Sequence, residues 1–170
     1  MGPEFFAWKE KEAPCLALYF YNDRIRTLLY QFKGCGDYEL KSIFFAYPKL
    51  ILRLKYRGYT VVPAPSSKSH DEKRGFNQVA AMCECLKLPI LDCLEKKVDA
   101  KQSDLSALER RQIGKYLAYR GPSSLNDKKI LLVDDVFTTG STARGCLALL
   151  RARNPKKLAF LTMAKTLPKT

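Results

Sequence analysis

The residues best suited to chemistry lie together in one stretch of the sequence. An apolar run, Ile130 to Val133, is followed at once by two carboxylates, Asp134 and Asp135. A turn of small hydroxyl residues and one glycine comes next: Thr138, Thr139, Gly140, Ser141 and Thr142. Backbone N–H groups and hydroxyls at the start of a helix bind phosphate well. Adjacent carboxylates suit sugar hydroxyls or Mg²⁺, so the stretch predicts a site for a phosphorylated sugar.

Each half of this pattern also has a purely structural interpretation. A Thr/Ser-Gly helix start is often no more than a cap, and an acidic pair at a strand end is often solvated. Because both features occur together and in this order, a binding site is favoured. The stretch has neither the Gly-Lys-Ser/Thr of a Walker A loop nor the Gly-x-Gly-x-x-Gly of dinucleotide-binding folds.

The run from Ile130 to Thr142 resembles the 5-phosphoribosyl-1-pyrophosphate (PRPP) signature of type I phosphoribosyltransferases at all of its thirteen positions, with Phe137 a slightly unusual choice. The resemblance implies that Asp134 and Asp135 are the catalytic carboxylates, contacting the ribose hydroxyls and Mg²⁺. It also implies that the Thr138–Thr142 turn holds the 5-phosphate. Pyrophosphate would lie on an earlier loop that contains Ser66, Ser67 and Lys68. Ribosyl transfer would then pass through an oxocarbenium-like state stabilised by fixed charges.

Four further segments are similar to the ComF/ComFC family of competence proteins, in order and spacing, from about residue 16 to 165. They comprise residues 21–37, 62–65, 73–78 and 102–110. Within the third segment, Arg74 is a candidate anion contact. Two departures stand out: the chain lacks the four-cysteine zinc module that usually precedes this domain, and Ile113 replaces an asparagine of the family pattern. We therefore expect a phosphoribosyltransferase-like domain over 16–165 without a zinc site.

The elements that must position these residues alternate between strands and helices. Apolar runs predict strands at residues 16–21, 59–62, 130–133 and 158–163, with a further short strand at 88–91. Helical periodicity predicts helices at 25–32, 37–54 with a break at Pro48, 78–86, 106 onward and 141–153. This order indicates a single α/β domain with a mostly parallel sheet flanked by helices, Rossmann-like and of the type I phosphoribosyltransferase class.

Charge and composition restrict the partners and the setting. The 170 residues carry a formal net charge of +13, with 46% apolar and 28% charged residues, which is typical of a folded protein. The charge is uneven, at +4, +3 and +6 for residues 1–60, 61–120 and 121–170. A basic surface beside a phosphate site is the footprint of a nucleic-acid binder. The candidate DNA or anion contacts are Arg74, Lys128, Lys129, Arg144 and Arg151, and the nine tyrosines offer stacking partners for unpaired bases.

No apolar stretch approaches the roughly 20 residues that cross a bilayer, so we expect a protein that is not embedded in the membrane. Six scattered cysteines predict a reducing, cytoplasmic setting. Cys83 and Cys85 form a C-x-C pair, but no second ligand pair accompanies them, and buried thiols are the simpler interpretation. Residues 1–5 resemble a cloning remnant.

Two functional hypotheses remain open at this level. The first, implied by the ComF resemblance, is a competence protein of natural transformation that assists uptake of single-stranded DNA, binds PRPP or a phosphosugar, and works with a ComFA-like helicase/ATPase. The second is an active, Mg²⁺-dependent phosphoribosyltransferase that uses PRPP in nucleotide salvage or synthesis. The intact acidic pair and hydroxyl turn favour ligand binding in both cases, and the lack of a recognisable base-binding hood weakens a salvage role.

Overall fold

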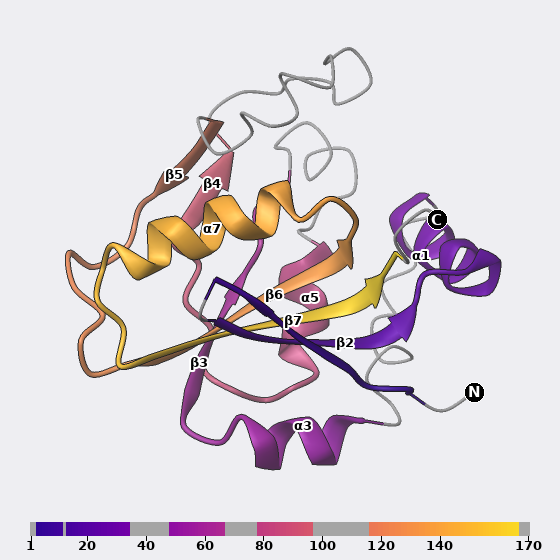
Figure 1. Ribbon diagram of the computed structural model, residues 1–170, viewed down its shortest axis with the longest axis horizontal. Helices are drawn as coiled ribbons and strands as arrows, with labels where there is room; N and C mark the ends of the chain where they lie inside the picture. Colours follow the sequence, from indigo (N-terminus) through magenta and orange to yellow (C-terminus); the bar gives the residue numbers. More distant parts are fainter. Residues whose placement is uncertain (1–2, 12, 35–47, 67–77, 97–115, 167–170) are drawn as a thin grey trace.

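The computed structural model describes residues 3–11, 13–34, 48–66, 78–96 and 116–166. A five-stranded sheet in the order β1-β2-β7-β6-β3 forms its centre (Figure 1). The first pair is antiparallel and the other three pairs are parallel. The strands are β1 (Phe6–Glu10), β2 (Ala13–Phe20), β3 (Tyr59–Pro63), β6 (Lys129–Phe137) and β7 (Lys157–Lys165). The predicted α/β fold with a mostly parallel sheet is confirmed.

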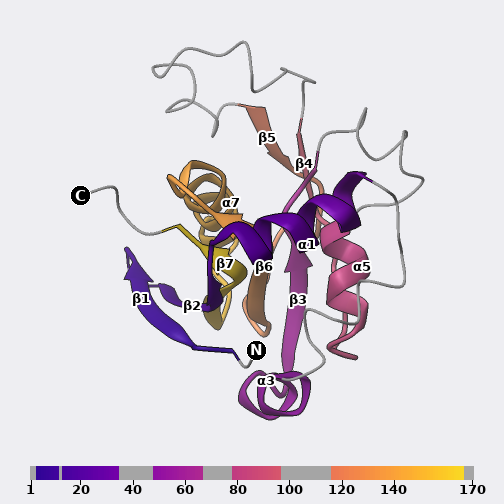
Figure 2. The same cartoon turned by 90° about the vertical axis from the view of Figure 1, so that its right-hand side faces the viewer.

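Helices cover both faces of this sheet. Helix α7 (Ser141–Arg151) lies on one face and α5 (Gln78–Glu84) on the other (Figure 2). Helix α1 (Asp23–Gly34) follows β2, and α3 (Lys49–Lys55) precedes β3. A separate antiparallel hairpin is made of β4 (Leu94–Lys96) and β5 (Leu117–Tyr119). Within the described ranges, no helix is long and apolar enough to cross a membrane.

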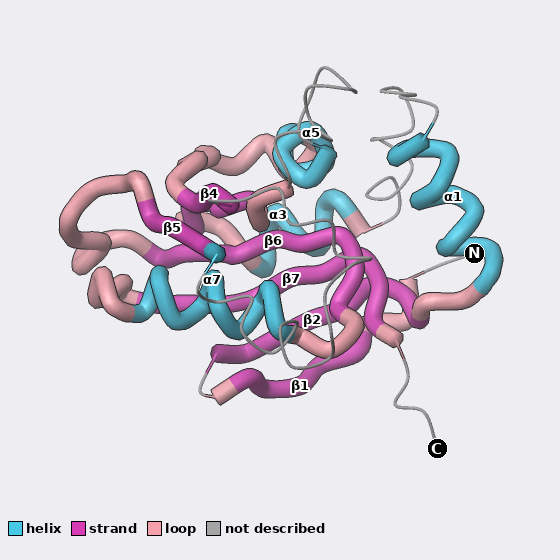
Figure 3. Tube along the Cα trace, turned by 90° about the horizontal axis from the view of Figure 1, so that it is seen from above, coloured by secondary structure: helices cyan, strands magenta, loops and turns pink. Residues whose placement is uncertain are grey.

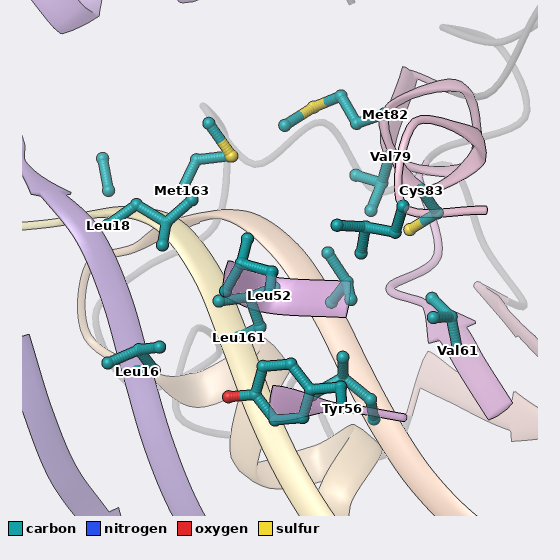
Figure 4. Close-up of a cluster of buried hydrophobic side chains, with 14 of the residues drawn as sticks. Leu16, Leu18, Leu52, Tyr56, Val61, Val79, Met82, Cys83, Leu161 and Met163 are labelled. Carbon is teal, nitrogen blue, oxygen red and sulfur yellow. The ribbon is translucent and has the colours of Figure 1, made fainter. Parts of the chain in front are cut away.

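The core is divided by the sheet into two clusters. Along β6, Ile130 and Leu132 point to the α7 side, whereas Leu131 and Val133 point to the α5 side, and all four are fully buried. Alternating side chains of a strand lie on opposite faces, so a strand buried on both faces is apolar throughout. Figure 4 shows the second cluster, in which Leu161 of β7 lies among side chains from α3 and α5.

Most predicted elements are present, with shifted ends. The strand predicted at 130–133 continues to Phe137, so the two carboxylates lie within β6 and not in the loop after it. The predicted strand at 88–91 is wrong, since it contributes a single parallel bridge from Ile90 to Val61. Strands β1, β4 and β5 were not predicted; β1 forms the outer edge of the sheet (Figure 3).

Helix α3 also corrects the predicted apolar face. That face placed Leu50, Ile51 and Leu54 inward, yet they are 66%, 55% and 67% exposed, and Leu52 is buried instead. The helix starts directly after Pro48, which lacks an N–H and so favours a helix start there. The face therefore follows the new start. The helices expected at 37–47 and from 106 onward lie outside the described residues.

Candidate functional site

The predicted acidic pair lies at the carboxyl end of β6, where it is half-buried. Asp134 pairs in register with Thr162 of β7. The Thr162 hydroxyl is fully buried and donates a hydrogen bond of 3.1 Å to the backbone carbonyl of Asp135. The Asp134 carboxylate accepts a 2.9 Å bond from the N–H of Asp135, and the Asp135 carboxylate accepts a 2.6 Å bond from the N–H of Val136. The backbone that carries both acids is thus fixed by β7.

The hydroxyl turn follows directly and leads into α7. Thr138 and Thr139 are exposed, whereas Gly140 is buried and adopts the left-handed conformation, with φ of 75°. A Cβ at this glycine would lie 2.5 Å from Cζ of Phe137 and 2.7 Å from Nη1 of Arg144. Real Cβ atoms do not approach other heavy atoms so closely, so both the backbone conformation and the available space require glycine here.

The aromatic ring under the turn is held from two sides. Phe137 is 6% exposed, and its ring centroid lies 5.0 Å from that of Trp8 and 5.9 Å from that of Phe160. Such edge-on aromatic packing adds to the stabilisation from burial. The floor of the turn is therefore rigid, and the slightly unusual phenylalanine of the motif is a packing residue.

The turn presents donors to solvent. The Thr139 and Ser141 hydroxyl oxygens are 3.0 Å apart and share one hydrogen bond. Helix α7 spans 11 residues, and no side-chain hydrogen bond from its N-cap, Gly140, closes its first turn. The N–H groups of that turn carry partial positive charge. Together, these groups are able to bind a phosphate.

Arg144 links this turn to the edge of the sheet. Its guanidinium donates to the backbone carbonyl of Thr139 and forms a 3.2 Å ion pair with the Glu10 carboxylate of β1. Glu10 also accepts a 3.3 Å hydrogen bond from the Trp8 indole. Arg144 was predicted as a DNA or anion contact, and that role stays a prediction. Its position adds a role in holding the turn, because it joins two segments that are 134 residues apart.

The pyrophosphate loop begins beside the acidic pair. Pro63 pairs in register with Val133, and the N–H of Ala64 donates a 2.8 Å bond to the carbonyl of Val133. The chain therefore leaves β3 next to Asp134, with Ser66 half-buried just beyond. Ser67, Lys68 and Arg74 lie outside the described residues, so their predicted roles stay predictions.

The predicted basic residues are not all brought to this site. Lys129 begins β6, five residues before Asp134, and Lys128 lies just ahead of it. At about 3.3 Å of rise per residue, Lys129 is about 16 Å from the acidic pair. Arg151 ends α7, whose first turn is at the site. The expectation that these three cations surround the phosphate turn is wrong, because extended β6 and α7 carry them to the opposite end of the sheet.

The acidic pair fits a magnesium ion that a ligand helps to hold. Within the residues that the structure describes, no group of three or more His, Cys, Asp or Glu side chains gathers. Mg²⁺ commonly takes one or two carboxylates and completes its shell with water and substrate phosphates. Asp134 and Asp135 therefore suit Mg²⁺ bound together with a phosphorylated ligand.

The cysteines of the described segments are free thiols, and four are buried: Cys15, Cys83, Cys93 and Cys146. Burial raises the pKa of Cys15 and of Cys93 to about 11. It raises the pKa of the two remaining buried thiols as well. Thiolates, and not thiols, attack electrophiles or ligate metals, so these groups pack as small apolar residues.

Sequence reasoning missed two residues of the site, Glu10 and Thr162. Glu10 lies on a strand that was not predicted, and its link to Arg144 spans almost the whole chain. Thr162 was assigned to a predicted strand, and a polar residue in an apolar run was the one available signal. Its buried hydroxyl is now explained by the Asp135 carbonyl.

Comparison with known proteins relates this geometry to two levels of similarity. The phosphoribosyl transferase domain family matches residues 72–169. Competence protein ComFC of Streptococcus pneumoniae is 31% identical over 150 residues, which cover 88% of this chain and 67% of that protein. Competence protein ComFC of Bacillus subtilis is 33% identical over 128 residues, which cover 74% of this chain and 53% of that protein. The chain thus spans about two thirds of one relative and half of the other.

The similarity in three dimensions extends to a solved enzyme. A hypoxanthine phosphoribosyltransferase from Trypanosoma cruzi superposes with a TM-score of 0.50 at 13% identity, covering 78% of this chain and 74% of that one. At this level of identity the match concerns the fold alone. It agrees with a type I phosphoribosyltransferase-like arrangement of sheet and helices.

Proposed function

Since the chain belongs to the ComFC family of competence proteins and carries a phosphoribosyl transferase domain, we propose that it binds PRPP or a related phosphosugar at the β6–α7 turn. We propose further that it assists uptake of single-stranded DNA on the cytoplasmic side of the membrane, together with a ComFA-like ATPase. The observation that carries the ligand proposal is the conjunction of Asp134 and Asp135 with a rigid hydroxyl turn built around left-handed Gly140.

Each part of the site has a distinct task in this proposal. Asp134 and Asp135 accept hydrogen bonds from the ribose hydroxyls. The Thr138–Thr142 turn donates its N–H groups and hydroxyls to the 5-phosphate, and the positive end of α7 adds to the attraction. Mg²⁺, held by the acidic pair and by ligand oxygens, would neutralise the diphosphate. Preorganised donors of this kind stabilise developing charge without a covalent nucleophile.

Calorimetric titration of PRPP with and without Mg²⁺ tests the ligand proposal. We expect Mg²⁺-dependent binding that Asp135→Asn weakens about 10- to 150-fold, since hydrogen bonds to charged groups contribute about 1.5–3 kcal/mol. Asp127→Asn is the matched control, because it removes the same charge from an exposed residue at the far end of β6. Equal affinity in Asp135→Asn and Asp127→Asn would refute the site.

A second titration tests the DNA proposal. Binding of a fluorescent oligothymidylate should weaken with salt, with a log–log slope of about −0.7 for each phosphate contacted. No binding at low salt would refute this part. Pyrophosphate release on addition of a base or amine acceptor would show turnover, and thus the enzymatic alternative, whereas binding without release would favour a ligand-binding role.

A further inference from the structure

A groove of about 500 Å³ opens on the α3 face of the sheet. It lies at the amino end of the parallel strands, away from the phosphate turn, since its lining includes the first residue of β3 and the first half of β2. Its lining comprises Ala7, Trp8, Lys9, Pro14, Cys15, Leu16, Lys55, Tyr56, Tyr59 and Ala159. A volume of this size is within the range of small-molecule sites, and one nucleotide fits it.

Two tyrosines form the wall of the groove on the side of α3. The ring centroids of Tyr56 and Tyr59 are 5.5 Å apart, and the rings meet edge to face at 82°. Tyr56 is 5% exposed, and its hydroxyl points toward Leu16 across the groove (Figure 4). Tyr59 is half-buried, so part of its ring remains accessible. The wall therefore offers a fixed aromatic surface and one phenolic hydroxyl.

Lysines surround these rings. The Nζ of Lys55 lies 6.0 Å from the Tyr56 ring centroid, and the Nζ of Lys129 lies 6.0 Å from that of Tyr59. Lys9 of β1 is exposed and lines the opposite wall. Among the described lining residues, no carboxylate balances these charges. An aromatic surface between cations matches a ligand that has a flat ring and negative charge.

The surrounding edge of the sheet extends the positive charge. Lys129 and Lys157 are partners in register, and the N–H of Lys156 donates to the carbonyl of Lys128. Arg57 precedes β3 at the same edge, and Asp127 is the nearby acid in sequence. This basic edge contains the very cations that the fold moves away from the phosphate turn. A ligand with several negative charges along its length would contact more of them than a single nucleotide.

We propose that this groove is the contact site for single-stranded DNA, holding one base against the tyrosine wall and the flanking phosphates on Lys9 and Lys55. The inference rests on the proposed DNA role for its ligand and on the groove for its position. Base stacking on an aromatic ring combined with lysine–phosphate contacts is the general way in which proteins bind single strands without reading sequence. PRPP binds elsewhere, about 16 Å or more along β6.

Paired variants of equal charge test the position. Lys9→Gln/Lys55→Gln removes two charges from the groove, and Arg24→Gln/Arg26→Gln removes two exposed charges from α1. For fluorescent oligothymidylate we expect the groove variant to lose about 1.4 from the magnitude of the salt slope, or about 0.7 for each phosphate contact. The α1 variant should keep the slope of the unaltered protein, and both should bind PRPP unchanged. Circular dichroism checks that each variant is folded.

Photocrosslinking locates the base directly and needs no variant. An oligothymidylate with one 5-iododeoxyuridine is irradiated on the unaltered protein, which is then digested with trypsin. Cleavage after Arg57 releases residues 58–68, in which Tyr59 is the sole aromatic residue. We expect the crosslink on Tyr59. Tyr59→Ser should weaken binding about 5- to 150-fold, as expected for loss of one stacked base, and Tyr59→Phe should restore it.

The outcomes separate this inference from the proposed function. If the unaltered protein binds the oligonucleotide, but both double variants weaken it equally and crosslinks map elsewhere, the groove is refuted while the DNA role stands. If the unaltered protein does not bind DNA at low salt, both are refuted. A lower slope confined to Lys9→Gln/Lys55→Gln, with a crosslink on Tyr59, supports the groove.

Discussion

Replacing Gly140 with alanine is the change for which the structure predicts the largest local effect. The residue adopts φ of 75°, a conformation that costs an L-residue about 1–2 kcal/mol. The added Cβ would also lie 2.5 and 2.8 Å from two atoms of the Phe137 ring and 2.7 Å from the Arg144 guanidinium. Arg144 is flexible and half-exposed, but the ring is held by Trp8 and Phe160 and cannot move without repacking.

The magnitude follows from adding these two effects. Overpacking a well-packed core costs about 1–3 kcal/mol. Together with the backbone penalty, Gly140→Ala should lower the free energy of unfolding by about 2–5 kcal/mol. That is a large share of the roughly 5–15 kcal/mol that stabilises a typical domain.

Gly58 provides a matched control. It has nearly the same backbone conformation, with φ of 77°, but nothing lies within 4 Å of the Cβ that alanine would add. Gly58→Ala should therefore show the backbone penalty alone. In urea unfolding, Gly140→Ala should lose about 1–3 kcal/mol more than Gly58→Ala. Equal loss in the two variants, or a smaller loss in Gly140→Ala, would refute the reasoning.

Three further changes follow from the same site. Arg144→Lys should change stability by less than about 1 kcal/mol, because its ion pair is partly exposed; PRPP affinity in calorimetry should fall about 2- to 10-fold, since the turn loses a hydrogen bond. Thr162→Val leaves the Asp135 carbonyl without its buried donor and should lower the free energy of unfolding by about 1–3 kcal/mol in urea. In a Cys35→Ser background at pH 8, Ellman's reagent should react quickly with no more than one thiol. The four buried thiols should react on unfolding, or faster as pH rises toward the pKa of about 11 of two of them; rapid reaction of several thiols would contradict their burial.

The part of the fold that carries the site was predictable because its sequence signals are local. Ile130 to Val133 is apolar throughout, as a strand covered on both faces must be. The glycine and hydroxyl residues that follow identify the start of α7 directly. Helix α5 was predicted with its inward face correct, because Val79, Met82, Cys83 and Leu86 keep helical spacing without an interrupting proline.

What could not be predicted depends on contacts between distant segments. The β1 strand has five residues of mixed polarity and is defined by its pairing with β2, while Glu10 gains its role from Arg144. The inward face of α3 depended on where Pro48 restarts the helix. Lys129 is close to Asp134 in sequence, yet extended β6 places it at the other end of the sheet. A short distance in sequence along a strand is thus a long distance in space.

The measurement that tests the central claim most directly is a two-dimensional amide NMR titration of the ¹⁵N-labelled protein with ribose 5-phosphate. If the β6–α7 turn holds the 5-phosphate, the largest shifts should fall on the backbone N–H groups of Thr139 to Thr142, including the readily identified Gly140. The amides of Tyr59 and Lys129, at the opposite end of the sheet, should not move. No shifts at the turn, or larger shifts at the amino end of the strands, would contradict the account.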